Sequence, residues 1–212
     1  FPHPIKDLRA RVIGIFAVLA GSGLLAGDEE SGILDLVLAH PISRAALFAG
    51  RWLAFVVTLA AIMGLMWLGS MVGMVYSEAL EISGGDMLLP FLSLFSLLAF
   101  FGGMALFLSM ILPSRRMAAM ISGILLVGSY FLTSLARISD GLKDAARFSP
   151  LNYFQGGDAI NGLNTGWVVG LLAFAALFTI LAWWRFERRD IRVAGEGGWR
   201  IALPWRKVAL PL

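Results

Sequence analysis

The chain has 212 residues, of which 58% are hydrophobic and 15% are charged, with a formal net charge of +3 and a mean hydropathy of +0.81. Soluble domains average about half apolar and a quarter charged residues, so this composition excludes an ordinary soluble protein. The sequence has no cysteine and only two histidines, His3 and His40, far apart. This excludes disulfides and thiolate metal sites and argues against a histidine metal site, so we expect no metal and no cofactor bound by this chain.

Five apolar stretches have about the ~20 residues that a helix needs to cross a bilayer. They are residues 12–27, 52–76, 87–112, 117–136 and 166–184. Because lipid offers the backbone no hydrogen-bond partners, segments this apolar must be helices. The sequence therefore predicts an all-α, polytopic transmembrane helical bundle, with residues 1–212 forming a single transmembrane domain.

The basic residues predict how the bundle is oriented. One side carries eleven Lys and Arg residues and the other carries six, while the acidic residues divide seven and seven. Positive residues favour the cytoplasm and acidic residues count for little. Residues 28–51, the "PSRR" turn and the basic tail 185–212 are therefore predicted to be cytoplasmic, and residues 137–165 external. With Phe1 outside and five spans, we expect a six-span subunit whose first helix precedes this sequence.

The second to fifth spans contain no Asp, Glu, Lys, Arg or His. Ion-coupled transporters usually keep ionisable groups at membrane depth, so this chain has no evident way to use an ion gradient. Small residues recur instead, with Gly69 and Gly73 at GxxxG spacing and Gly102 next to Gly103. They predict close helix packing within the subunit, with a subunit interface or a moving seam as the alternative.

The segment 28–51 interrupts two spans with acidic residues and then a short apolar helix, predicted over residues 32–39. Ser31 can cap this helix, whose surface is mostly apolar and needs the membrane, its own bundle or another protein to rest on. No G-x-x-x-x-G-K-[ST] occurs anywhere in the sequence, so ATP phosphates are not bound by that route. No catalytic residues are predicted.

The external segment and the tail carry the other candidate residues. The external segment is predicted to be an interfacial helix that shields the bundle, with a gate on the external face, closed by Asn152, Tyr153 and Phe154, as the alternative. Arg185, Arg188 and Arg189 follow the last span and are predicted to anchor it at anionic headgroups, with contact to a partner protein as the alternative.

The stretch "EESGILDLVLAHPISRAALFAGRWLA" resembles the cytoplasmic motif of ABC-2-type transporter permeases. The matching positions are Glu29, Glu30, Gly32, Leu34, Asp35, Leu36, Leu38, Pro41, Ile42, Ser43, Arg44 and Gly50. Ile33 replaces the usual Thr, and Arg51 replaces the usual Lys. "FSPLNYF" and "RFERRDI" resemble the stretches before and after the last span of that family.

The resemblance implies a type V exporter-like permease that works as a homodimer with two copies of a separate ATP-binding cassette ATPase, which would hold ATP and Mg. It implies that the cytoplasmic segment is a coupling helix on the ATPase, and that substrate leaves through a cavity between the two permeases. The residues assigned to coupling are Glu29, Glu30, Gly32, Leu34, Asp35, Leu38, Pro41 and Arg44.

The implied location is a bacterial plasma (inner) membrane, with the lipid bilayer and no nucleic acid among the partners. Glu29 and Glu30 could pair with the ATPase or with Arg44 and Arg51 of the same chain. Two other functions stay open: an ATP-independent channel or facilitator, and a membrane anchor or assembly protein.

Overall fold

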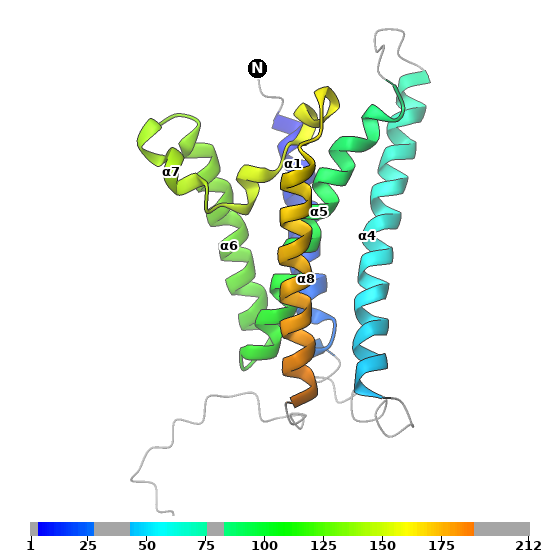
Figure 1. Cartoon of the computed structure of the whole chain (residues 1–212), viewed down its shortest axis with the longest axis vertical. Helices are drawn as coiled ribbons and strands as arrows, with labels where there is room; N and C mark the ends of the chain where they lie inside the picture. Colours follow the sequence, from blue (N-terminus) through cyan, green and yellow to red (C-terminus); the bar gives the residue numbers. More distant parts are fainter. Residues whose placement is uncertain (1–3, 28–42, 76–82, 189–212) are drawn as a thin grey trace, which may run out of the picture.

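The computed structural model describes residues 4–27, 43–75 and 83–188, and these residues form helices and turns without a β-strand. Five main helices cross the bundle (Figure 1). They are α1 (Pro4–Gly23), α4 (Arg44–Val75), α5 (Leu89–Ile111), α6 (Arg115–Ala136) and α8 (Thr165–Arg188). The last four are long and apolar enough to cross a membrane, whereas the apolar part of α1, Gly14–Gly23, is shorter. An all-α multi-pass bundle is confirmed.

Local capping decides where several helices begin. The hydroxyl of Ser43 accepts a hydrogen bond from the Ala46 amide at 3.2 Å, so α4 begins at Arg44, eight residues before the apolar stretch predicted from Trp52. Ser114 caps α6 in the same way, accepting from the Met117 amide at 3.2 Å. Such hydroxyls satisfy amides that a helix N-terminus leaves without partners. Helix ends therefore follow the capping residues, whereas the spans predicted from hydropathy follow the apolar residues alone.

The helices alternate in direction, which places two sets of chain ends at opposite ends of the bundle (Figure 1). The end of α1, the start of α4, the α5–α6 turn and the end of α8 lie together. This is the end predicted to be cytoplasmic. The opposite, predicted external end carries the segment between α6 and α8.

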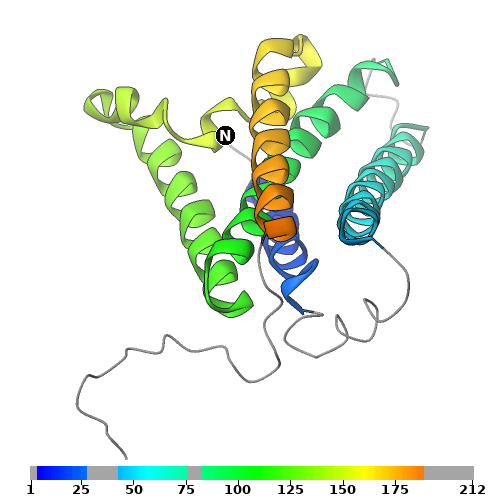
Figure 2. The ribbon, with the colours of Figure 1, turned by 60° about the horizontal axis from the view of Figure 1, so that its bottom comes forward.

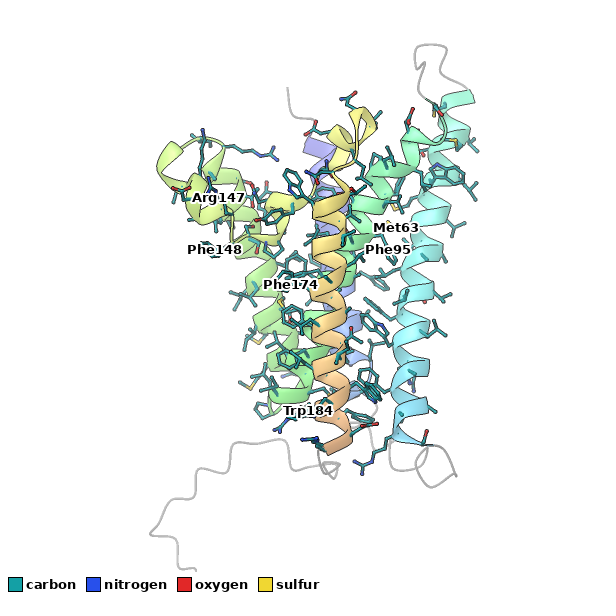
Figure 3. The ribbon with its side chains drawn as sticks, viewed as in Figure 1. Met63, Phe95, Arg147, Phe148, Phe174 and Trp184 are labelled. Atoms are coloured by element: carbon teal, nitrogen blue, oxygen red, sulfur yellow. The ribbon has the colours of Figure 1, made fainter. Side chains whose placement is uncertain are left out.

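Helix α5 is the centre of the bundle, and α1, α4, α6 and α8 all contact it. In its most apolar stretch 67% of the residues are buried, against 17% in each of α4, α6 and α8. Its sequence has no polar face, and a helix that is apolar all round belongs inside a bundle or a membrane. Helix α4 stands at the edge (Figure 2), packing through Phe55, Leu59 and Met63. Met63 lies near Phe95 of α5 (Figure 3).

Glycines permit close contacts on two sides of α5. A Cβ atom on Gly21 of α1 would collide with the carbonyl oxygen of Gly102, and one on Gly103 would lie 2.9 Å from the carbonyl oxygen of Ala175 in α8. Gly102 and Gly103 thus pack within the subunit, as the sequence predicts. Gly69 and Gly73 differ, because a Cβ there would meet no described atom within 4 Å. For that pair the prediction of packing within the subunit is wrong in the described part of the chain.

The external segment is built from short pieces rather than one long helix. After α6 come η2 (Asp140–Leu142), α7 (Lys143–Ala146), η3 (Pro150–Tyr153) and η4 (Gly156–Asn161). We expected Leu142, Ala145, Ala146 and Phe148 to form one apolar face. Helix α7 has only four residues, and Phe148 beyond it is 89% exposed, so that face does not form. Pro150 and the glycines after it keep the helical pieces short.

Candidate functional site

At the predicted cytoplasmic end, arginines from α4 and α6 lie near the end of α1. A cavity of about 290 Å³ lies there, and its lining includes Gly23, Arg51 of α4 and Arg115 of α6. Arg44, the one residue of the predicted coupling set that the structure describes, opens α4 and is half-buried. The others, Glu29, Glu30, Gly32, Leu34, Asp35, Leu38 and Pro41, lie outside the described residues.

Arg115 lies directly against the end of α1. A Cβ atom on Gly23 would be 2.9 Å from a terminal guanidinium nitrogen of Arg115, and one on Gly27 would be 3.3 Å from the other. A cation at this position is favoured, because unpaired carbonyls give the C-terminus of a helix partial negative charge. In the sequence, Arg115 served only as a marker of topology. The sequence signal that could have indicated its position is the pair of glycines Gly23 and Gly27, four residues apart, which leave room for the guanidinium.

The three residues of the predicted external gate do not converge on one point. The Tyr153 hydroxyl donates to the backbone oxygen of Arg147 at 2.8 Å, and its ring meets Trp167 edge-on at 5.7 Å. Both rings pack against the buried cluster that includes Phe100 and Phe101 of α5, and Phe154 also packs against the cluster that includes Phe55 of α4. Asn152 is half-buried in η3. The two neighbouring rings therefore share one buried cluster but differ in their other contacts.

Buried hydroxyls hold the external segment to the bundle. Ser149, just before η3, is 2% exposed, and its hydroxyl lies 3.0 Å from the Ser129 carbonyl and 2.8 Å from the Thr133 hydroxyl. A serine has one proton to donate, and it goes to the carbonyl, so Thr133 is the donor to Ser149. The backbone N–H of Gln155 also donates to the Ser93 hydroxyl of α5 at 3.1 Å. Sequence reasoning missed this network, although Ser149 stands in the quoted "FSPLNYF" motif.

A cavity of about 310 Å³ opens between α1 and α6, with α5 as its floor and η3 beside its outer end. We call it the α1–α6 cavity. It is lined by Gly14, Ile15, Leu97, Leu98, Phe101, Leu126, Val127, Tyr130, Phe131, Thr133, Ser134, Arg137, Leu151 and Phe154. Phe154 thus lines it, whereas Tyr153 lines a second, aromatic groove of about 490 Å³ along α8 with Phe148 and Phe174. Figure 3 shows Phe174 on α8 below Arg147 and Phe148 of the external segment.

The family model of the ABC-2 family transporter protein matches residues 5–191, which is most of the chain and includes every helix that the structure describes except the first residue of α1. The chain belongs to the ABC-2 transporter family. A search of curated proteins finds no match. The resemblance seen in residues 29–50 is thereby confirmed, and the protein is a permease subunit of an ABC transporter.

Family membership identifies this ABC-2 permease as a multi-pass membrane component of transport and not as a catalyst by itself. Permeases of this family generally work with an ATPase partner. Among the described residues, no three His, Cys, Asp or Glu side chains lie together as metal ligands would.

The predicted membrane anchors of the permease lie at the end of α8. Arg185 and Arg188 occupy its last turn and are exposed, while Arg189 lies outside the described residues. The guanidinium carbon of Arg188 sits 4.4 Å from the centre of the Trp184 ring, a cation–π contact. Trp184, at the lower end of α8 in Figure 3, and Trp183 are exposed beside these arginines. Tryptophan next to arginine is typical of a helix end at the membrane interface.

Proposed function

We propose that this ABC-2 permease is the membrane subunit of an ATP-driven exporter, in which two permease copies enclose the substrate path and two separate ATPase subunits supply the energy. The observation that carries the proposal is the family match over residues 5–191, since it includes the segment between α1 and α4 as well as the spans. ATP and Mg would bind to the ATPases. The expected location is the plasma (inner) membrane of a bacterium.

The spans themselves support an external source of energy. Residues 52–76, 87–112, 117–136 and 166–184 have no Asp, Glu, Lys, Arg or His, the residues from which proton and ion relays in membranes are usually built. The sequence also lacks the phosphate-binding loop that would let this chain use ATP alone. A partner ATPase would supply the energy that neither an ion gradient nor ATP bound by this chain provides.

The proposed mechanism starts at the coupling segment. Closure of the ATPase dimer on ATP would push the predicted helix over residues 32–39 toward the membrane. The described chain continues on either side of it at Gly27, four residues after α1, and at Ser43, just before α4. Near these points the cavity lined by Arg51 and Arg115 lies between α1, α4 and α6. A push there would reach α1, α4 and α6 together. Glu29 and Glu30 would pair with the ATPase or with Arg44 and Arg51.

The external segment would form the exit. Asn152, Tyr153 and Phe154 sit where α5, α6 and α8 approach the predicted external end, and the buried Ser149 ties them to α6. Movement of α6 would therefore be passed to η3. Export is proposed because the segment lies at the outer end of the predicted topology, where an outward gate belongs.

The proposal is tested by exchanging Leu34 and Leu38 for Asp in a tagged permease purified from native membranes. We expect loss of the co-purified ATPase or of its substrate-stimulated hydrolysis, because charge replaces the apolar contact. Ile138→Asp is the matched control, since Ile138 is 86% exposed at the opposite end of the bundle. Wild-type hydrolysis and co-purification in the Leu34→Asp/Leu38→Asp variant would refute the coupling role.

The same purification separates the alternative functions. A permease that carries substrate across vesicles without any ATPase would be a channel or facilitator. A permease that assembles with partners but gives no substrate efflux would be an anchor or assembly protein.

A further inference from the structure

We infer that the α1–α6 cavity binds an amphiphile with one hydrocarbon chain and an anionic head group, the chain lying toward the membrane centre and the head group at Arg137. This goes beyond the proposed function, because the cavity lies within one subunit and its occupancy requires no ATPase.

The shape of the cavity suits a chain that enters from the bilayer. Its inner part is apolar, formed by Gly14, Phe101 and Leu126. At its side Ile15 of α1 and Phe131 of α6 are 52% and 58% exposed, so the cavity opens laterally between these two helices. Since Phe131 belongs to the membrane-crossing helix α6 and Ile15 to the apolar part of α1, we expect this side to face hydrocarbon. At about 310 Å³, the cavity is near the lower limit of the usual range for small-molecule sites, about 300–1,000 Å³.

The part of the lining that α6 contributes changes from apolar to polar toward the predicted external end. In that direction the residues are Leu126, Val127, Tyr130, Phe131, Thr133, Ser134 and Arg137. Leu126, Tyr130, Thr133 and Arg137 follow one another at three or four residues, which keeps them on one face of the helix. At ~1.5 Å per residue they span about 16 Å, close to one half of the ~30 Å hydrocarbon core. The lining thus changes from apolar to cationic over about the thickness of one leaflet. An amphiphile that lies along the membrane normal has the same arrangement of chain and head group.

Charge selects the head group. Arg137 is exposed at the outer end of the cavity, and the other described residues of the lining are uncharged. Asp144, seven residues further along the chain, lies within 3.4 Å of Arg147. A guanidinium binds phosphate or carboxylate through two parallel hydrogen bonds and repels an ammonium group. Arg137 therefore favours an anionic head group over a cationic one on the same chain.

The absence of cysteine from the sequence allows a clean binding assay. Val127→Cys places a fluorophore at the side of the cavity, where Val127 is 50% exposed, and Ile138→Cys places one outside it. The probes are 12-bromododecyl phosphate and 12-bromododecyltrimethylammonium, added to protein in phosphatidylcholine vesicles. Bromine at the chain end quenches a fluorophore that it touches, so quenching at position 127 reports the chain inside the cavity.

For each label we compare the probe concentrations that give half-maximal quenching, as the ratio of the ammonium value to the phosphate value. We expect this ratio to be about tenfold higher at position 127 than at position 138. Arg137→Gln should remove this preference. Arg147→Gln is the matched control, because Arg147 is an exposed cation of the same external segment that lies outside the α1–α6 cavity. It should leave the preference intact.

Two results would overturn the inference. One is equal quenching by both probes at position 127 after correction by position 138. The other is an equal effect of Arg137→Gln at both label positions, which would make Arg137 a general attractor of anions to the membrane surface and not part of a site. Neither result depends on the ATPase, so both differ from failure of the proposed function.

Discussion

Gly21 of α1 and Gly102 of α5 lie back to back, so that the backbones of the two helices touch where side chains would normally separate them. On the other side of the same turn, Gly103 approaches the Ala175 carbonyl of α8. Since no hydrophobic force draws helices together in lipid, such close approach stabilises the bundle through van der Waals contact.

Gly21→Ala should therefore destabilise the permease by ~1–3 kcal/mol, the usual cost of overfilling a packed site. The added methyl group would collide with the Gly102 carbonyl, and neither backbone can move aside easily. Gly123→Ala on α6 is the control, because its Cβ would meet nothing within 4 Å and alanine favours helix. Unfolding titrations in mixed micelles measure both. Equal stability of the two variants would show that the helices are not in contact.

Ser149→Ala should loosen the external segment. Without the Ser149 hydroxyl, Thr133 loses the acceptor for its buried proton, at a cost of ~1–3 kcal/mol. We expect faster hydrogen exchange over η3 and little change in α8. Ser139→Ala, an exposed serine in the same segment, should leave exchange as in the wild type.

Arg115→Ala should lower stability by ~0.3–1 kcal/mol more than Arg116→Ala, the range expected for a cation at a helix C-terminus. Both side chains are exposed and adjacent, but Arg115 is the one placed against Gly23. Equilibrium unfolding of the two variants at low salt makes the comparison, and added salt should reduce the difference. Identical values in low salt would contradict the contact with α1.

Phe154→Ala should open the outer end of the α1–α6 cavity, because its ring is part of the lining there. A membrane-impermeant thiol reagent should then react faster with Val127→Cys from the outside. Tyr153→Ala is the control, since the Tyr153 ring lines the groove along α8 instead. If both variants accelerate labelling equally, the two rings do not face different surfaces.

Much of the architecture could be predicted from the sequence. The apolar stretches became the helices α4, α5, α6 and α8, and the resemblance in residues 29–50 led to the family that the match over residues 5–191 confirms. The apolar span was predicted from Trp52, within a helix expected to run from Pro41 through Arg44 and Arg51; α4 does run through both arginines and begins at Arg44, after its cap Ser43. Charged residues such as Arg44 and Arg51 continue a helix as readily as apolar ones.

The candidate sites were harder to predict from the sequence than the helices. Phe154 and Tyr153 were predicted as one gate, yet Tyr153 ends the 3₁₀ helix η3 and Phe154 follows it in an extended conformation, and the two rings line different cavities. The Ser149–Thr133 contact joins residues sixteen positions apart, on α6 and in the external segment. No local pattern specifies such a pairing, because it depends on where the external segment returns to the bundle.

By itself the sequence determined the helical class, the alternation of the helices and the family, because lipid forces every apolar span to satisfy its backbone internally. Tertiary structure alone decided which faces are buried. In a bilayer an apolar side chain is equally at home against lipid or against another helix, so composition does not separate the buried Gly102 from the open Gly73. Only the packing around α5 made that distinction, and with it the cavity that ends at Arg137.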